Sequence, residues 1–160
     1  MKITVAAIGR LKAGPERDLA KRYAERFEAT ARPLGLTGPV ITEYAESLAR
    51  SVSERKAQEA QMLLSGVTED AALIQLDERG ETVSSEVFAR KIEKWRDSGR
   101  KSIVFAIGGA DGHGALLSAR ADQSLSFGAM TLPHQLLRVV LLEQLYRAAT
   151  ILSGHPYHRV

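Results

Sequence analysis

The hydrophobic positions along the chain fall into short apolar runs separated by longer segments with helical spacing. The runs are residues 2–8, 40–44, 72–77 and 102–107, which are rich in Val, Ile, Leu and Ala and predict four strands. The first helical segment begins at Pro15, a residue suited to the first helical turn.

Capping signals indicate where the other helices begin and end. Ser51 and Glu54 form a capping box that begins the second helix. Either Ser84 or Ser85 caps the third helix, and Gly99 ends it in the position that favours a left-handed residue.

Turn residues complete the outline. Residues 31–39 break the first helix, and the Glu-Arg-Gly segment 78–80 is predicted to end the third strand. A short helix over 115–122 follows the fourth strand, and a long helix begins near Pro133 and ends at Gly154. Strands that alternate with helices predict a single α/β domain over 1–160 with a mostly parallel sheet, in which ligands bind beyond the carboxyl ends of the strands.

The long helix, 134–152, is apolar on nearly every side. Its charged residues Arg138, Glu143 and Arg147 argue against a membrane span, because one central charge costs about 2.5–3.5 kcal/mol in a bilayer. Such a helix needs more cover than one sheet offers, so we expect a homodimer built on it. The alternative is a helix buried wholly within the monomer. Glu143 and Arg147 are spaced to form an ion pair, whereas Arg138 and Arg147 are expected to hold the dimer or the chain's tail.

Composition adds a few limits. The chain has no cysteine, which excludes disulfides and thiolate chemistry, and its first residues form a strand pattern rather than a signal peptide, so we expect a cytoplasmic protein. A net charge of +3 permits a nucleic-acid partner without requiring one. Lys2, Arg10, Lys12 and Arg17 form either a basic rim or scattered surface charge. No His and carboxylate spacing indicates a metal site.

The glycine-rich segment 108–114, which follows the fourth strand, is the strongest chemical signal. It lacks the lysine and hydroxyl residue of a P-loop, and its glycines are not spaced as in the dinucleotide-binding fingerprint. Taken alone, it is as well explained by a plain tight turn. Asp111 either has a structural or donor-steering role in this loop or caps the helix that begins near 115, and His113 is expected on the surface.

Three segments together resemble one family: IGGADG, LSFGAMTLPHQLLRVVLLEQLYRA and the terminal HPYHR. They resemble RlmH, the small SPOUT-class methyltransferases, over essentially the whole chain, although Ala110-Asp111 stand where that family often has Pro-Glu. The resemblance implies a deep trefoil knot over about 72–160. It also implies transfer of a methyl group from S-adenosylmethionine to N3 of a pseudouridine in 23S ribosomal RNA, within the assembled ribosome.

The same resemblance implies where the methyl donor binds, without a metal. Glycines 108 and 109 are expected to let the backbone approach the donor closely, because they have no Cβ. The expected donor contacts are Leu76, Gly108, Phe127, Gly128, Ala129, Met130, Thr131 and Leu132.

The tail 155–159 carries the expected catalytic residues Tyr157, His158 and Arg159. A tyrosine can stack on a base, a histidine can transfer a proton, and an arginine can bind phosphate or a developing anion. The resemblance implies that this tail reaches the active site of the partner subunit. His134 either lies near the mouth of the pocket or caps the long helix, and no residue stands out as a general base.

Two other functions compete with this prediction. One is a non-catalytic ribosome-binding factor on the same fold. The other is a nucleotide-dependent oxidoreductase, which the missing dinucleotide fingerprint disfavours.

Overall fold

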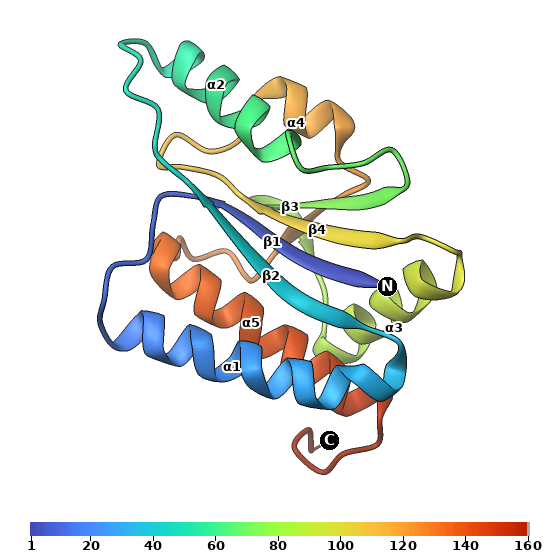
Figure 1. Ribbon diagram of the computed structural model, residues 1–160. Helices are drawn as coiled ribbons and strands as arrows, with labels where there is room; N and C mark the ends of the chain where they lie inside the picture. The colour runs from blue at the N-terminus through green and yellow to red at the C-terminus, as the bar shows by residue number, and fades with distance from the viewer. Residues whose placement is uncertain (160) are drawn as a thin grey trace.

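The computed structural model describes residues 1–159 and is built around a five-stranded sheet (Figure 1). The strand order is β2-β1-β4-β3-β5, and every neighbouring pair is parallel. The predicted α/β class is therefore confirmed. The strands are β1 Lys2–Ile8, β2 Thr37–Tyr44, β3 Ala71–Thr82, β4 Ser102–Ile107 and β5 Gln123–Ser126.

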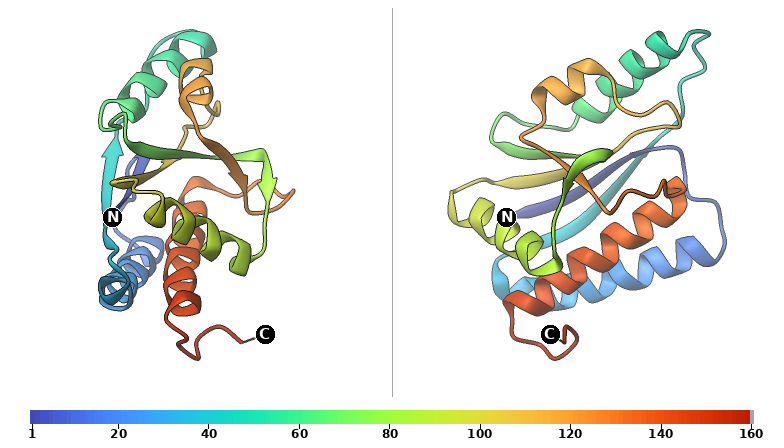
Figure 2. Two further views of the ribbon diagram at one scale, coloured as in Figure 1. Left: turned by 90° about the vertical axis from the view of Figure 1, so that its right-hand side faces the viewer. Right: turned by 180° about the vertical axis from the view of Figure 1, so that it is seen from behind.

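Helices cover both faces of this sheet (Figure 2). Alternate residues of β1 and β4 point into two separate cores, as the period of two along a strand requires. Helices α1, α3 and α5 close the larger core, and α2 and α4 close the smaller one. The helices are α1 Pro15–Ala31, α2 Val52–Leu64, α3 Ser85–Asp97, α4 Ala115–Arg120 and α5 His134–Leu152, with a short 3₁₀ turn at Arg32–Leu34.

The predicted caps are confirmed. The hydroxyl oxygen of Ser51 accepts a hydrogen bond from the Glu54 amide at 3.2 Å. Ser84, rather than Ser85, caps α3 by accepting from the Val87 amide at 3.3 Å. Gly99 follows α3 with a φ of 81°, the left-handed conformation that glycine tolerates best.

The prediction that residues 78–80 end the third strand is wrong. β3 continues to Thr82, and it pairs with β5 twice, at Ile74–Leu76 and again at Glu81–Thr82. A Cβ on Gly80 would lie only 2.5 Å from the carbonyl carbon of Leu125. The glycine is therefore required by the close approach of β5 rather than by a turn.

Helix α5 is covered mainly by its own chain. It packs against α1 and α3, and nine of its residues are buried in the monomer. Leu136 stays 45% exposed, so the monomer leaves part of the apolar surface of α5 open, and the homodimer stays a prediction. Within residues 1–159, no helix combines the length and the apolarity needed to cross a membrane.

Candidate functional site

A cavity of about 420 Å³ lies at the carboxyl ends of β3 and β4. Three loops form its walls: the continuation of β3 at 76–79, the glycine-rich loop at 107–113 and the segment 125–132. The first turn of α5 completes the wall with His134 and Leu137. A cavity of this size at this edge of a parallel sheet is typical of a small-molecule site.

The loops bring together nearly all the residues expected to bind the methyl donor. Leu76 lies on β3 and Gly108 directly follows the adjacent strand β4, and most of the segment 127–132 also lines the cavity. The expected residues that line it are Leu76, Gly108, Phe127, Gly128, Met130, Thr131 and Leu132. Ala129 is not among the lining residues.

The glycine-rich loop is shaped by helix α2. A Cβ on Gly109 would lie 2.6 Å from the Oε2 atom of Glu59, and one on Gly114 would lie 2.5 Å from the carbonyl oxygen of Lys56. Gly108 and Gly109 both line the cavity, so their expected close approach to the donor stays a prediction. An added Cβ would meet the His113 ring at Gly108 and the Glu59 carboxylate at Gly109, so packing within the protein also favours glycine at both positions.

Replacing Gly114 by alanine is expected to destabilise the protein by about 1–3 kcal/mol, the usual cost of overpacking. The added methyl group meets backbone of α2, which cannot turn away as a side chain can. The control is Gly66→Ala, where the nearest atom is the Tyr44 hydroxyl at 3.8 Å. Urea unfolding followed by circular dichroism measures both variants, and equal stabilities would refute this interpretation of the loop.

Asp111 holds the glycine-rich loop against α2. Its carboxylate accepts hydrogen bonds from Nε of Arg55 at 2.6 Å and from Nη2 at 3.3 Å, and this guanidinium lowers the pKa of Asp111. The N-cap of α4 is Gly114, with no side-chain cap. The structural role is confirmed, but the helix-capping interpretation of Asp111 is wrong.

His113 lies in the cavity wall, so the prediction of a surface position is wrong. Its Nε2 atom is 2.9 Å from the carbonyl oxygen of Leu76. Because a carbonyl only accepts, Nε2 carries the hydrogen and Nδ1 is a bare acceptor. Nδ1 is buried with no hydrogen-bond partner in residues 1–159. Burial lowers the pKa of His113, which favours the neutral ring.

Acidification from pH 7.5 to 5.5 is expected to destabilise the protein through His113. Its pKa is lower in the folded state than in the unfolded chain, so the unfolded chain binds the proton first as the pH falls. The variant His113→Gln should show a smaller loss of unfolding free energy between these two pH values. Parallel urea titrations test this, and identical pH dependence in variant and wild type would contradict the assignment.

His134 is the first residue of α5 and lines the cavity, as one of its two predicted roles required. The helix has Pro133 as N-cap and no side-chain cap, so the capping alternative is wrong. The Nδ1 atom of His134 is buried and has no partner in the part of the chain that the structure describes. The pocket wall thus contains two histidine Nδ1 atoms without partners.

Arg138 ties α5 to the ends of β1 and β2. Its side chain is 4% exposed, and Nη1 lies 2.6 Å from Oε1 of Glu43. Nη2 donates to the carbonyl oxygens of Ile8 and Gly9, each at 2.7 Å. Arg138 was expected to hold a dimer or the tail; it holds the end of the sheet instead, beside the cavity.

The tail is anchored at the other end of α5. The Tyr157 hydroxyl donates to Glu143 at 3.0 Å, and the guanidinium of Arg147 lies 4.9 Å from the centre of the Tyr157 ring. Arg147 also pairs with Glu143, as the spacing predicted. Nε2 of His158 is 2.6 Å from Oε1 of Glu86, and Arg159 is exposed.

This position keeps the tail away from its own cavity. Helix α5 begins at the cavity and runs 19 residues away from it, a length of about 28 Å. Figure 1 shows the carboxyl terminus at the opposite end of the helix. The structure therefore does not bring Tyr157, His158 and Arg159 to the expected donor residues of the same chain. Within residues 1–159, no group of three or more His, Asp or Glu side chains is arranged to hold a metal ion.

Comparison with known proteins places the chain in a class of enzymes, because a family model described as "Predicted SPOUT methyltransferase" matches residues 1–158. A protein of Rhodopseudomonas palustris (strain BisB18) is 55% identical over 159 residues, and one of Mesorhizobium japonicum is 57% identical, with 99% of both chains covered in each case. Both are named Ribosomal RNA large subunit methyltransferase H. The chain therefore belongs to the ribosomal RNA large subunit methyltransferase H family of SPOUT methyltransferases.

Among solved structures, the SpoU methyltransferase AviRb from Streptomyces viridochromogenes, in complex with AdoMet, is similar with a TM-score of 0.41 and 13% identity. The match covers 96% of this chain and 61% of that one.

Proposed function

We propose that the whole chain is one methyltransferase domain that methylates N3 of a pseudouridine in 23S ribosomal RNA, with S-adenosylmethionine as donor. The names of its full-length relatives support ribosomal RNA as the substrate class. The observation that carries the proposal is the cavity, where Leu76, Gly108 and the segment 127–132 meet at the carboxyl edge of the sheet. The reaction takes place in the cytoplasm, on the large subunit of the assembled 70S ribosome.

The cavity fits an adenosine-containing donor. Leu76, Leu132 and Met130 offer apolar surface for the faces of an adenine ring. The backbone amides of residues 129–132 have no hydrogen-bond partner in the described chain, so they are available to the edge of that ring. S-adenosylmethionine, when bound, supplies an electrophilic methyl group on a sulfonium sulfur, chemistry that needs neither a metal nor a phosphate cradle.

The protein's own contribution is mainly alignment. N3 of pseudouridine is a weakly acidic imide, so it must lose its proton before its lone pair forms the new N–C bond. Walls that hold the base in line with the methyl group, and cations that stabilise the imide anion, lower this barrier. The target base is reached in an RNA loop, where it can be splayed out of its stack.

The tail completes the site from a second copy of the chain. Tyr157 and His158 are held by Glu143 and Glu86, neither of which lines the cavity of the same chain, so a homodimer is the arrangement we propose for placing the tail near the reacting base. There Tyr157 stacks on the base, Arg159 binds phosphate or the anion, and His158 accepts or relays the proton.

A trefoil knot over about 72–160 is part of the same proposal. Its support is the placement of β5 beside β3, which brings the segment 127–132 against the loop after β4. A knotted chain is a rare exception to the usual connection rules.

Calorimetric titration with S-adenosylmethionine, followed by transfer of a tritiated methyl group to unmodified 70S ribosomes, tests the proposal. We expect one donor bound per chain and tritium in 23S RNA. Ribosome binding without donor binding or transfer would favour the non-catalytic factor. Binding of a nicotinamide dinucleotide in place of the donor would favour the oxidoreductase.

A further inference from the structure

The loop between β2 and α2, residues 45–51, presents an apolar side chain to solvent beside the cavity. Leu48 is 96% exposed. A single exposed leucine is common in soluble proteins and carries no meaning alone. What distinguishes Leu48 is that its loop is held in place on both sides of it.

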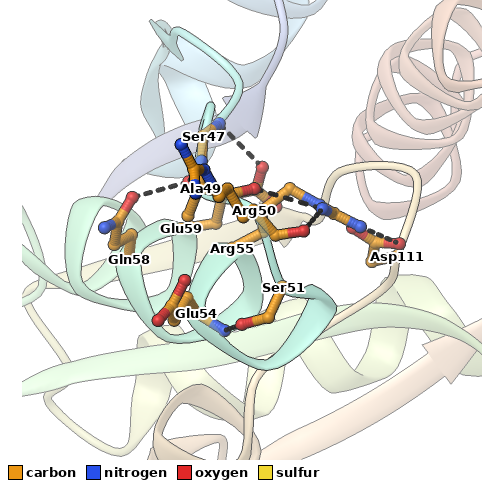
Figure 3. Close-up of polar contacts among 9 residues, drawn as sticks. All are labelled: Ser47, Ala49, Arg50, Ser51, Glu54, Arg55, Gln58, Glu59 and Asp111. Atoms are coloured by element: carbon orange, nitrogen blue, oxygen red, sulfur yellow. Dashed lines mark hydrogen bonds and ion pairs between the residues drawn. The ribbon is translucent and has the colours of Figure 1, made fainter.

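The contacts that hold this loop come from one face of α2 (Figure 3). The Ser47 amide donates to Oε1 of Glu59 at 3.1 Å, and Glu59 is only 5% exposed. Beyond Leu48, Nη1 of Arg55 donates to the carbonyl oxygens of Ala49 and Arg50, both at 3.1 Å. Backbone that is fixed before and after Leu48 loses little further entropy when that side chain meets a partner.

The same guanidinium fixes the loop relative to the cavity. Through its other nitrogens Arg55 binds both carboxylate oxygens of Asp111, and Asp111 lines the cavity. Glu59 likewise connects the two loops: its Oε1 accepts from the Ser47 amide in the 45–51 loop, and its Oε2 lies against Gly109 in the glycine-rich loop. Two side chains of α2, Arg55 and Glu59, therefore fix the position of Leu48 relative to the loop that lines the proposed donor site.

Two cationic side chains lie near this position. Arg50 is exposed next to Leu48, and Lys56 lies in the cavity wall. The exposed Arg10 and Lys12 do not belong to this group, because the loop after β1 turns toward α1 and the 45–51 loop turns toward α2 on the other face of the sheet (Figure 1).

Other charged residues either oppose the positive charge near Leu48 or lie far from it. Glu46 and Glu54 are exposed nearby and offset part of its positive charge. Lys2, which the sequence offered for a basic rim with Arg10 and Lys12, begins β1 and so lies at the opposite edge of the sheet.

We propose that the 45–51 loop contacts the RNA substrate next to the target nucleotide. Leu48 packs against the face of an unstacked base, and Arg50 binds a backbone phosphate. An apolar side chain flanked by cations matches single-stranded RNA, whose splayed bases offer apolar faces and whose phosphates are regularly spaced. This inference rests on the proposed function, since it takes ribosomal RNA as the substrate.

The test compares four single variants of the full chain: Leu48→Asn, Leu48→Met, Arg50→Gln and, as a charge-matched control, Arg22→Gln on the exposed side of α1. Affinity for unmodified large ribosomal subunits is measured by sedimentation, and affinity for S-adenosylmethionine by calorimetry. Leu48→Asn should weaken subunit binding about tenfold, because the apolar surface that leucine buries against the base is lost. Leu48→Met and Arg22→Gln should bind as the wild type does.

Salt dependence separates a phosphate contact from a structural effect. Arg50→Gln should reduce the slope of log affinity against log salt concentration by about 0.7, the value for one phosphate of a single strand. The affinity of each variant for S-adenosylmethionine should stay within twofold of the wild type.

The inference would be overturned by unchanged subunit affinity in Leu48→Asn and Arg50→Gln, by equal loss of donor and subunit affinity, or by a wild type that does not bind the subunit. Weaker binding to subunits with unchanged binding to protein-free 23S RNA would also overturn it, because the loop would then contact a ribosomal protein. Failure of methyl transfer in the wild type, with the predicted binding losses intact, would instead reject the proposed reaction and leave the loop assignment standing.

Discussion

Mixing two inactive variants is expected to restore methyl transfer. Arg159→Ala removes the tail's cation, and Leu132→Arg places a positive charge in the cavity wall where the cationic sulfonium would bind. Each variant alone should lose at least about a hundredfold in kcat/KM, the usual scale for one lost electrostatic or proton-transfer group. If the tail serves the partner's cavity, each mixed dimer has one intact site, so co-expression of the two chains should recover about a quarter of the wild-type activity.

The control for this experiment is a chain that carries both changes, co-expressed with Leu132→Arg. That mixture has no intact cavity, so it should stay inactive. Tritium transfer to ribosomes is the measurement in each case. A mixture of the two single variants that remains inactive, although gel filtration shows mixed dimers, would refute the shared site, as would an Arg159→Ala enzyme with full activity.

Replacing Arg138 by methionine is expected to cost about 3–5 kcal/mol of unfolding free energy, the range for removing one partner of a buried ion pair. The change leaves the carboxylate of Glu43 without its cationic partner, with only the Leu11 amide still donating to it at 2.9 Å, and removes the Arg138 donor from the carbonyls of Ile8 and Gly9. The exposed pair of Arg32 and Glu28 gives the matched control, because Arg32→Met should cost less than about 1 kcal/mol.

A second substitution checks the cause of that loss. Glu43→Gln added to Arg138→Met removes the stranded charge and should recover part of the lost stability. Urea unfolding measures all of these variants. A loss for Arg138→Met no larger than that for Arg32→Met would contradict the anchoring role at the end of the sheet.

The sequence predicted the helices and strands that are determined by residues close to one another along the chain. The apolar runs of β1 and β4 and the caps at Ser51 and Ser84 depend on neighbours within a few residues, so the sequence was sufficient. The continuation of β3 past Gly80 could not be predicted, because its cause is the backbone of β5, which comes much later in the chain.

In the candidate site, too, the features that could not be predicted depend on segments distant in the sequence. No residue near Gly109 or Gly114 indicates that α2 will lie against them, so their contacts with Glu59 and Lys56 could not be predicted from the sequence. His113 was placed on the surface because its partner, the carbonyl of Leu76, belongs to another strand. The residues expected to bind the donor came instead from the resemblance of whole motifs, and all but Ala129 line the cavity.

Mass spectrometry of 23S RNA after incubation with the purified protein and a methyl-deuterated S-adenosylmethionine tests the central claim most directly. The substrate is ribosomes from cells that lack the gene. The account predicts one deuterated methyl group, on a pseudouridine whose nucleoside co-elutes with an N3-methyl standard. A label on any other nucleoside, or RNA without label although the protein binds the donor, would contradict it.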